Sequence, residues 1–341
     1  MTKRLLLTGA GGSIGCHTLA YVLDHTDWNV ICVDSFRHKG MPDRIVQVLN
    51  DPSHNVWRRW SRVKLLTHDL TSPLSPITMR SIGAIDHIIA MASLSDVHAS
   101  LVDPVPFVTN NVAVALNLLE YARAAQPETF LLVSTDEVYG PTDGVSTHKE
   151  WSSVLPSNPY SASKAAQEAL GIAWWRAYGI PLVIVNLMNN FGEMQSPAKF
   201  PAIVQRKVRA GETVDIHAQD GVVGSRWYIH SRNTADALLF LLQRGQVTKH
   251  AEGTLDRPDR YNIVGDRQLK NDELALMIAN IVGKPLKHRI VPASTSRPGH
   301  DVHYGLDGGK LAALGWRSPT SLEDSLRQTV EWYERHPEWL L

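Results

Sequence analysis

The sequence contains only two cysteines in 341 residues, Cys16 and Cys32. They fall in a predicted helix and a predicted strand, and no CxxC pair or Cys/His spacing typical of zinc accompanies them. The fifteen histidines are scattered along the chain and are interpreted as surface or packing residues. A disulfide framework is therefore excluded, and we expect no bound metal.

The chain also lacks an excess of charge and a long apolar run. Its 34 Lys and Arg residues balance 34 Asp and Glu residues, which argues against nucleic acid or an anionic membrane as a partner. Any anion must be held by a local pocket. The apolar run near the N-terminus is three residues long, and none approaches the ~20 residues of a membrane span. We expect a globular, cytoplasmic protein without a signal peptide.

Continuous runs of Val, Ile and Leu, separated by helical stretches, are the main structural signal. Such runs are typical of strands buried on both faces of a parallel sheet. The expected strands are 4–8, 29–35, 85–93, 129–135 and 180–188, with helices at 110–125 and 161–179. This alternation predicts an α/β fold with a Rossmann-type, doubly wound parallel sheet.

The pattern loosens after Asn189, where proline, glycine and charged residues increase. We predict a Rossmann domain over 1–188 and a smaller α/β lobe over 189–341, with some segments of the latter returning to the first domain. A terminal amphipathic helix is expected from the spacing of four apolar residues: Leu322, Leu326, Val330 and Tyr333.

The first chemical motif is "TGAGGSIG", which follows a strand and opens a helix. Its glycines allow the backbone to approach a pyrophosphate at the helix N-terminus. Asp34 ends the second strand, where a carboxylate accepts a bond from the ribose 2′-hydroxyl and repels a 2′-phosphate. We therefore predict NAD as cofactor, although Arg37, His38 and Lys39 leave NADP open. The candidate cofactor residues are Gly9, Gly12, Ser13, Ile14, Gly15, Asp34, Asp69, Leu70, Ala90, Tyr160 and Lys164.

The second motif is "YSASK", which places Tyr160 and Lys164 on one face of a helix. A neighbouring ammonium and the positive nicotinamide favour the phenolate, which can then remove a proton from a hydroxyl group. Thr135 supplies a hydroxyl at a strand end, and Asp136 and Glu137 follow it directly. Two adjacent carboxyls push their pKa values apart, so that one serves as acid and the other as base.

Together these motifs resemble the extended short-chain dehydrogenase/reductase family of nucleotide-sugar enzymes. The stretches "STDEVYG", "NPYSASKA", "NNFG", "RPGHD" and "LGW" are similar, more narrowly, to nucleotide-sugar 4,6-dehydratases such as those acting on dTDP-glucose. The resemblance covers nearly the whole chain, and the Thr-Asp-Glu triplet is its most specific element.

The resemblance implies a lyase with an NAD-dependent mechanism. Tyr160 deprotonates the C4 hydroxyl while hydride passes to NAD⁺, Glu137 removes the C5 proton, and Asp136 protonates the departing C6 hydroxyl. Hydride then returns to C6, which leaves a 4-keto-6-deoxy sugar. Thr135 and Lys164 complete the implied catalytic set.

The resemblance also implies a nucleoside-diphosphate sugar as substrate. The implied binding residues are Ser95, Asn189, Asn190, Lys199, Arg226, Arg297 and His300. The chain departs from the family pattern at 94–98 and at 191–200, which leaves the hexose and the nucleotide base open. The family's dimers pack two helices from each subunit, and the helices at 110–125 and 161–179 predict a homodimer of this kind.

Three alternatives remain open at this stage. A 4-epimerase or decarboxylase on the same scaffold would use Tyr160 and NAD but leave Glu137 idle. A 5,6-dehydratase would use the same acid–base pair and return hydride to C4. A dinucleotide-sensing protein without turnover is disfavoured, because such proteins commonly lose the tyrosine or the lysine.

Overall fold

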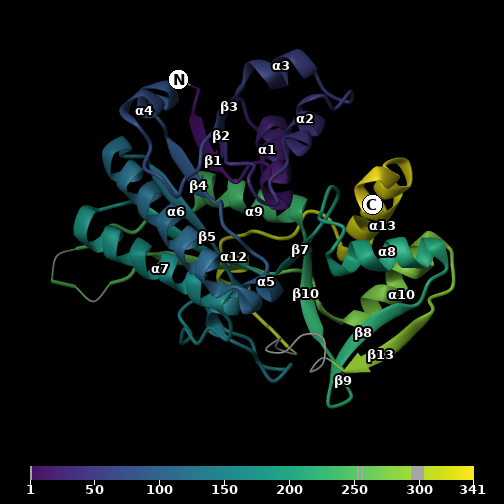
Figure 1. Ribbon diagram of the computed structural model, residues 1–341. Helices are drawn as coiled ribbons and strands as arrows, with labels where there is room; N and C mark the ends of the chain where they lie inside the picture. The colour runs from purple at the N-terminus through teal and green to yellow at the C-terminus, as the bar shows by residue number, and fades with distance from the viewer. Residues whose placement is uncertain (1, 252, 255, 293–302) are drawn as a thin grey trace.

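Seven parallel strands form the central sheet of the computed structural model, which describes residues 2–251, 253–254, 256–292 and 303–341 (Figure 1). The strands are β1 (Arg4–Thr8), β2 (Asn29–Asp34), β3 (Val63–Thr67), β4 (His87–Ala90), β5 (Thr129–Thr135), β6 (Leu182–Leu187) and β11 (Asp259–Ile263). Their order is β11-β6-β5-β4-β1-β2-β3. The predicted Rossmann-type fold is confirmed, with its crevice expected at the carboxyl ends of the strands.

Helices cover both faces of this sheet, and neighbouring residues of a strand pack against opposite layers. One layer comprises α1 (Ser13–His25), α2 (Pro42–Leu49) and α9 (Ser231–Arg244), and the other α4 (Pro76–Ile82), α6 (Pro104–Ala125) and α7 (Pro159–Tyr178). Leu5 and Leu7 belong to the core under the first layer, whereas Leu6 belongs to the core under the second. Burial on both faces explains why the strands are continuously apolar.

Two strands of the sheet were not expected from the sequence. β3 lies at one edge, where Lys64 and Leu65 are exposed, so its pattern is not that of a buried strand. β11 lies at the other edge, and Arg260 and Asn262 interrupt its apolar pattern although both are buried. Tertiary contacts, rather than local apolar runs, place both strands.

The second lobe follows β6 directly and contains two small sheets. Its strands are β7 (Asn189–Phe191), β8 (Val214–Gln219), β9 (Val222–Val223), β10 (Ser225–His230), β12 (Gln268–Lys270) and β13 (His288–Pro292). The sheet orders are β12-β10-β7 and β13-β8-β9. Because β7 begins two residues after β6 ends, the lobe starts at the carboxyl edge of the central sheet.

Helices α8 (Phe200–Ala210), α10 (Asn271–Val282) and α13 (Leu322–Arg335) close the core of this lobe. The expected terminal helix is confirmed as α13, and all four of its predicted apolar positions are buried. Shorter helices are α3 (Val56–Ser61), α5 (Val97–Val102), α12 (Gly309–Ala313) and the 3₁₀ turns η1 (Asp136–Tyr139) and η2 (Pro337–Leu340).

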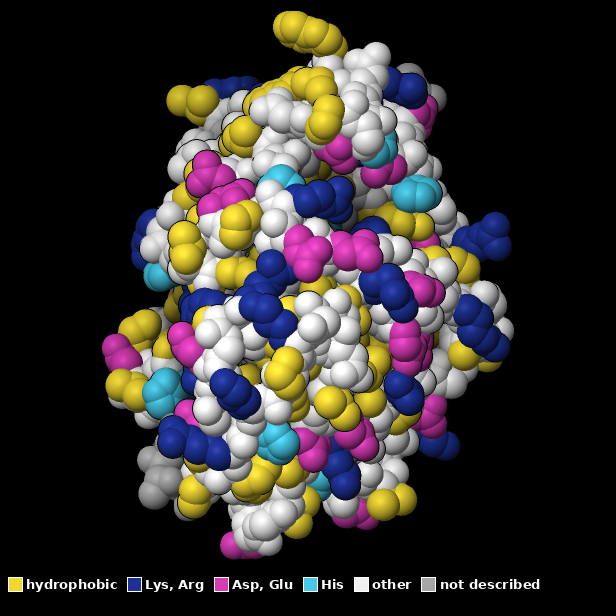
Figure 2. Space-filling model, turned by 90° about the vertical axis from the view of Figure 1, so that its right-hand side faces the viewer, with side chains coloured by type: hydrophobic (Ala, Val, Ile, Leu, Met, Phe, Trp, Pro, Cys, Tyr) yellow, Lys and Arg dark blue, Asp and Glu magenta, His cyan; other side chains and the backbone are white. Residues whose placement is uncertain are grey.

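Charged side chains of both signs are interspersed on the face that carries the second lobe (Figure 2). This distribution agrees with the neutral composition, because no area of one sign dominates that face. Among the described residues, no helix is long and apolar enough to cross a membrane.

Candidate functional site

The strand-end triplet lies inside the protein rather than at its surface. β5 is buried along its whole length, and η1 begins at Asp136, whose residue surface is only 5% exposed. The Thr135 hydroxyl donates a hydrogen bond to Asp136 Oδ1 over 2.9 Å. Glu137 is half-buried beside it. Two carboxyls thus share a site with little access to water.

Burial sets the protonation of Asp136. Burial raises the pKa of this carboxyl and the charge of Glu137 adds to the rise, so that, against the opposing effects of Thr135 and Arg226, the pKa is about 7. Asp136 Oδ2 is buried without a hydrogen-bond partner among the described residues. A carboxyl held in this way keeps its proton near neutral pH and can donate it.

Helix α7 brings Tyr160 and Lys164 to the same place. Pro159 starts the helix, and the Asn158 side chain caps it by accepting a bond from Ser161 N–H. Burial raises the pKa of Tyr160, and the negative charge of Glu137 adds to this rise, while a hydrogen bond with Thr135 lowers it. These contacts bring Thr135, Glu137 and Tyr160 together.

Lys164 is buried, and its ammonium is directed at the sheet. Nζ donates to the Val133 carbonyl over 2.7 Å and to Gln167 Oε1 over 2.5 Å. Burial lowers the pKa of Lys164 to about 8, against the raising effect of Glu168. The expected acidification of Tyr160 by Lys164 is therefore not seen in the chain alone, because burial raises the pKa of Tyr160 and the ammonium is directed at Val133 and Gln167. A phenolate needs additional positive charge.

The glycine turn forms an open cradle in front of α1. Gly9 has a φ of +72°, and a Cβ atom on Gly15 would lie 2.1 Å from the Gly9 carbonyl oxygen, so a side chain is excluded at Gly15. No side chain caps α1 at Gly12, and Ser13 Oγ is buried without a partner among the described residues. An uncapped helix N-terminus with an unpaired hydroxyl suits a phosphate group, so these residues fit the diphosphate of a dinucleotide.

Asp34 joins this cradle to the end of β2. Its carboxylate accepts bonds from Gly11 N–H and Phe36 N–H, each over 3.0 Å. Two of the cations that left NADP open are paired with acids: Arg37 with Asp69, and Lys39 with Asp96. Leu70 and Ala90 are buried, Ala90 at the end of β4, and Ile14 lies in the first turn of α1.

The predicted substrate residues are spread around the crevice. Ser95, Asn189 and Lys199 are exposed, on the loop after β4, at the start of β7 and at the N-cap of α8 respectively. Asn190 is held within the lobe, since its Oδ1 accepts from Thr234 Oγ1 over 2.7 Å.

Arg226, on β10, has its guanidinium 4.9 Å from the centre of the Tyr304 ring. Its charge lowers the pKa of Asp136, so Arg226 lies close enough to act on the carboxyl pair. Similarly, the positive charge of Lys199 lowers the pKa of Asp96, so the start of α8 lies near the loop after β4. Arg297 and His300 lie outside the described residues.

Comparison with known proteins agrees with this arrangement. A profile of the NAD dependent epimerase/dehydratase family matches residues 5–263. The chain belongs to this family. The predicted resemblance to nucleotide-sugar dehydratases of the extended short-chain dehydrogenase/reductase type is confirmed, as are the enzymatic nature of the chain and the cofactor NAD.

Individual relatives of this epimerase/dehydratase cover nearly its full length. The chain is 32% identical over 331 residues to the low-salt glycan biosynthesis protein Agl12 of Haloferax volcanii, covering 96% of this chain and 98% of that protein. It is 27% identical to dTDP-glucose 4,6-dehydratase 1 of Escherichia coli K12, covering 99% and 94%.

Solved structures show the same relationship. DesIV, a dTDP-glucose 4,6-dehydratase of Streptomyces venezuelae with NAD and TYD bound, matches with a TM-score of 0.84, 30% identity and 98% coverage of both chains. The UDP-glucose 4-epimerase of Thermus thermophilus, in complex with NAD, matches with a TM-score of 0.80 and 25% identity, covering 97% of this chain and 99% of that one.

Sequence reasoning missed a buried polar network behind the predicted catalytic residues of this epimerase/dehydratase. Asn186 Nδ2 donates to the Thr135 carbonyl over 3.0 Å and to Glu168 Oε1 over 2.9 Å. Glu168 in turn pairs with Arg260 at 2.6 Å, and both side chains are almost fully buried. The available signal was Asn186 itself, a polar residue that interrupts the apolar run of β6.

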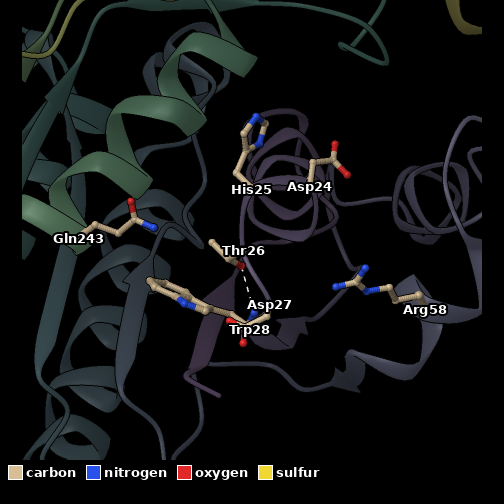
Figure 3. A pocket seen from close by; sticks show the side chains of 7 residues that line it. All are labelled: Asp24, His25, Thr26, Asp27, Trp28, Arg58 and Gln243. Atoms are coloured by element: carbon tan, nitrogen blue, oxygen red, sulfur yellow. Dashed lines mark hydrogen bonds between the residues drawn. The ribbon is translucent and has the colours of Figure 1, made fainter. Parts of the chain in front are cut away.

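A hollow on the surface near the end of α1 is a separate feature (Figure 3). It has a volume of about 470 Å³ and is lined by Asp24, His25, Thr26, Asp27, Trp28, Arg58 and Gln243. Asp24 and His25 end α1, whereas the glycine turn begins it. This hollow therefore lies at the opposite end of α1 from the cofactor cradle and contains none of the predicted site residues.

The raised pKa of Asp136 predicts an unusual dependence of the free energy of unfolding on pH. Its pKa in the folded protein is raised to about 7, so its contribution to stability is fully present below its ordinary pKa and is lost as pH rises towards 7. Asp136→Asn removes this loss. We expect the variant to gain on the order of 4 kcal/mol in free energy of unfolding, relative to the native chain, between pH 4 and pH 8.

Urea denaturation of both proteins at several pH values measures this difference. A stability difference that does not change with pH would show that Asp136 is ionised throughout, and would contradict its proposed state.

Proposed function

We propose that this enzyme removes water from a nucleoside-diphosphate hexose by NAD-dependent 4,6-dehydration. The observation that carries the proposal is the carboxyl pair at the end of β5, where a buried Asp136 with a raised pKa adjoins Glu137 beside Tyr160. An epimerase needs no such pair, because it breaks no carbon–oxygen bond of the sugar. The dehydratase relatives support the same reading.

Each side chain then has one proton to move. Tyr160 takes the proton of the C4 hydroxyl, Glu137 takes the proton from C5, and Asp136 gives its proton to the C6 hydroxyl as it leaves as water. When hydride is returned to C6, Glu137 gives a proton back to C5, which completes the 4-keto-6-deoxy sugar. The cofactor, when bound, supplies a hydride acceptor for C4, a hydride donor for C6, and positive charge beside the phenol. Lys164, held by Val133, positions the cofactor ribose beside Tyr160.

The remaining residues serve binding. The glycine turn and Ser13 hold the cofactor diphosphate, and Asp34 the adenosine ribose. Arg226 and Lys199 supply positive charge for the substrate diphosphate in an otherwise neutral protein, with Asn189, Asn190 and Ser95 nearby. Among the dehydratase relatives, the Escherichia coli protein and DesIV are named for dTDP-glucose, while a trifunctional Arabidopsis thaliana protein, of which the chain covers 48%, is named for UDP-glucose. The nucleotide base and the hexose of the substrate are identified by the panel of nucleotide sugars described below.

A homodimer remains our prediction for the assembly, and the cytoplasm for its location. α6 and α7 pack against each other, and α6 exposes Val105, Val108 and Leu116 at intervals that fall on one helix stripe. Such a stripe supports packing against a second pair of helices.

Mass spectrometry of the purified protein with a panel of nucleotide sugars tests the proposed reaction. We expect one substrate to lose one water, and NMR of the product to show a 4-keto-6-deoxy sugar. A product of unchanged mass would instead establish a 4-epimerase, loss of CO₂ a decarboxylase, and loss of water with the C4 hydroxyl retained a 5,6-dehydratase.

Glu137→Gln separates the two halves of the reaction. An amide cannot accept the C5 proton, so we expect bound NAD⁺ to be reduced while solvent deuterium no longer enters C5. Absorbance of the reduced cofactor and NMR in D₂O report the two steps. Full dehydration by this variant would remove Glu137 from the mechanism.

Tyr160→Phe addresses the first half alone. Loss of the base is expected to slow reduction of NAD⁺ by substrate roughly 100-fold to 10,000-fold, the usual contribution of a general base. Single-turnover absorbance measures this rate. An unchanged rate would mean that another group takes the C4 proton.

A further inference from the structure

Asn158 connects the helix that carries Tyr160 to the carboxylate of Glu137. Its Oδ1 accepts a hydrogen bond from Ser161 N–H over 2.9 Å, and its Nδ2 donates one to Glu137 Oε2 over 2.9 Å. The residue is only 5% exposed. One side chain thus touches both the N-terminus of α7 and one member of the carboxyl pair.

The chemistry of these two contacts fixes the orientation of the amide. A backbone N–H group can only donate, so the atom of Asn158 that faces Ser161 must be the oxygen. The NH₂ group is then directed at Glu137. The reversed amide would set two donors against each other and its oxygen against a carboxylate, so the helix cap determines what Glu137 receives.

The two neighbouring carboxyls consequently have different partners. Glu137 receives an amide N–H, whereas Asp136 Oδ2 is buried with no partner among the described residues and Oδ1 receives the Thr135 hydroxyl. Hydrogen bonds donated to a carboxylate favour its charged form, and only one of two adjacent carboxyls ionises easily. The deeper burial of Asp136 and its Oδ2, unpartnered in the described part of the chain, together with the amide donor to Glu137, therefore favour the charge on Glu137.

We propose that Asn158 is a positioning residue that selects Glu137 as the ionised member of the pair and fixes its carboxylate relative to Tyr160. This inference rests on the proposed function for its catalytic consequence, because an ionised Glu137 is the base required at C5. Its consequence for the charge state of the pair holds without substrate.

The other charged and titratable groups around the pair act in known directions. Asp136, adjacent in η1, and Tyr160, from α7, repel a charge on Glu137 when they ionise, and Arg226, from β10, acts on Asp136. The positive charge of Arg226 favours ionisation of Asp136 and so opposes the separation of the two carboxyls, whereas the Asn158 amide donor favours the charge on Glu137. Its removal moves the titration of Glu137 to higher pH.

Two variants remove the donor while keeping the helix cap. In Asn158→Ser a hydroxyl caps α7 but is too short to replace the amide bond to Glu137, and in Asn158→Asp a carboxylate caps α7 and repels Glu137. Asn55 offers a matched control, because it caps α3 in the same way by accepting from Arg58 N–H but is exposed. Asn55→Asp therefore makes the same change at a cap away from the site.

NMR of ¹³C-labelled side-chain carboxyls, assigned with Glu137→Gln and Asp136→Asn, gives the first readout. We expect Glu137 to titrate below Asp136 in the native protein, and to titrate at higher pH in both Asn158 variants, most in Asn158→Asp. The Asn55→Asp control leaves both titrations unchanged. If neither Asn158 variant moves the titration of Glu137, the selection role is wrong.

The second readout compares the two half-reactions with substrate. Loss of a hydrogen bond to a charged group should slow deuterium entry at C5 by about 10-fold to 100-fold in Asn158→Ser, with the limiting pH of that step shifted upward. KM and the rate of NAD⁺ reduction stay near native values. An equal loss in both half-reactions with an unchanged pH profile would indicate a structural role only and overturn the proposal.

The two readouts distinguish this inference from the proposed function. If the native protein removes water from no nucleotide sugar, dehydration fails, yet the carboxyl titrations still test Asn158. If water is lost but the titrations do not respond, dehydration stands and the role of Asn158 does not. Should Asn158→Asp fail to fold, Asn158→Ser carries both measurements.

Discussion

The free-energy cost of burying charge at the end of β5 determines the properties of the predicted active site. Asp136 and Glu137 follow a strand that is buried along its full length, and two adjacent carboxylates in such a place repel each other and lose hydration. This cost raises the pKa of Asp136 to about 7, which favours its protonated form. The acid and the base that the proposed dehydration needs thereby arise from two residues of nearly the same chemical type, distinguished only by their surroundings.

Those surroundings are held by polar contacts within an apolar layer. Asn186 ties the Thr135 carbonyl to Glu168, and Glu168 is paired with Arg260 in a nearly dry environment. A buried ion pair contributes little net stability because of its desolvation, so its value lies in fixing the position of the groups around it. Here it joins β5, β6, β11 and α7, the elements that surround the catalytic residues.

The two lobes contribute different groups for binding. The glycine turn, Asp34 and the uncapped start of α1 suit a dinucleotide on the central sheet, while β10 and α8 bring Arg226 and Lys199 from the second lobe. Both cations act on acids of the first domain, Asp136 and Asp96 respectively. A neutral chain can therefore bind an anionic sugar nucleotide by local charge, which agrees with the mixed charges seen over the second lobe (Figure 2).

Local sequence was enough to predict the continuously apolar strands of the sheet and to locate the glycine turn with Asp34 and the two motifs that we propose are catalytic. Each of these features depends on neighbours within one or two turns of chain. It did not reveal β3 or β11, whose polar residues are stabilised by distant partners. Three properties depend on the tertiary structure: the raised pKa of Asp136, the raised pKa of Tyr160 and the direction of the Lys164 ammonium. These properties depend on burial and on contacts between groups from separate strands and helices. Neither burial nor such contacts can be predicted from neighbouring residues in the sequence.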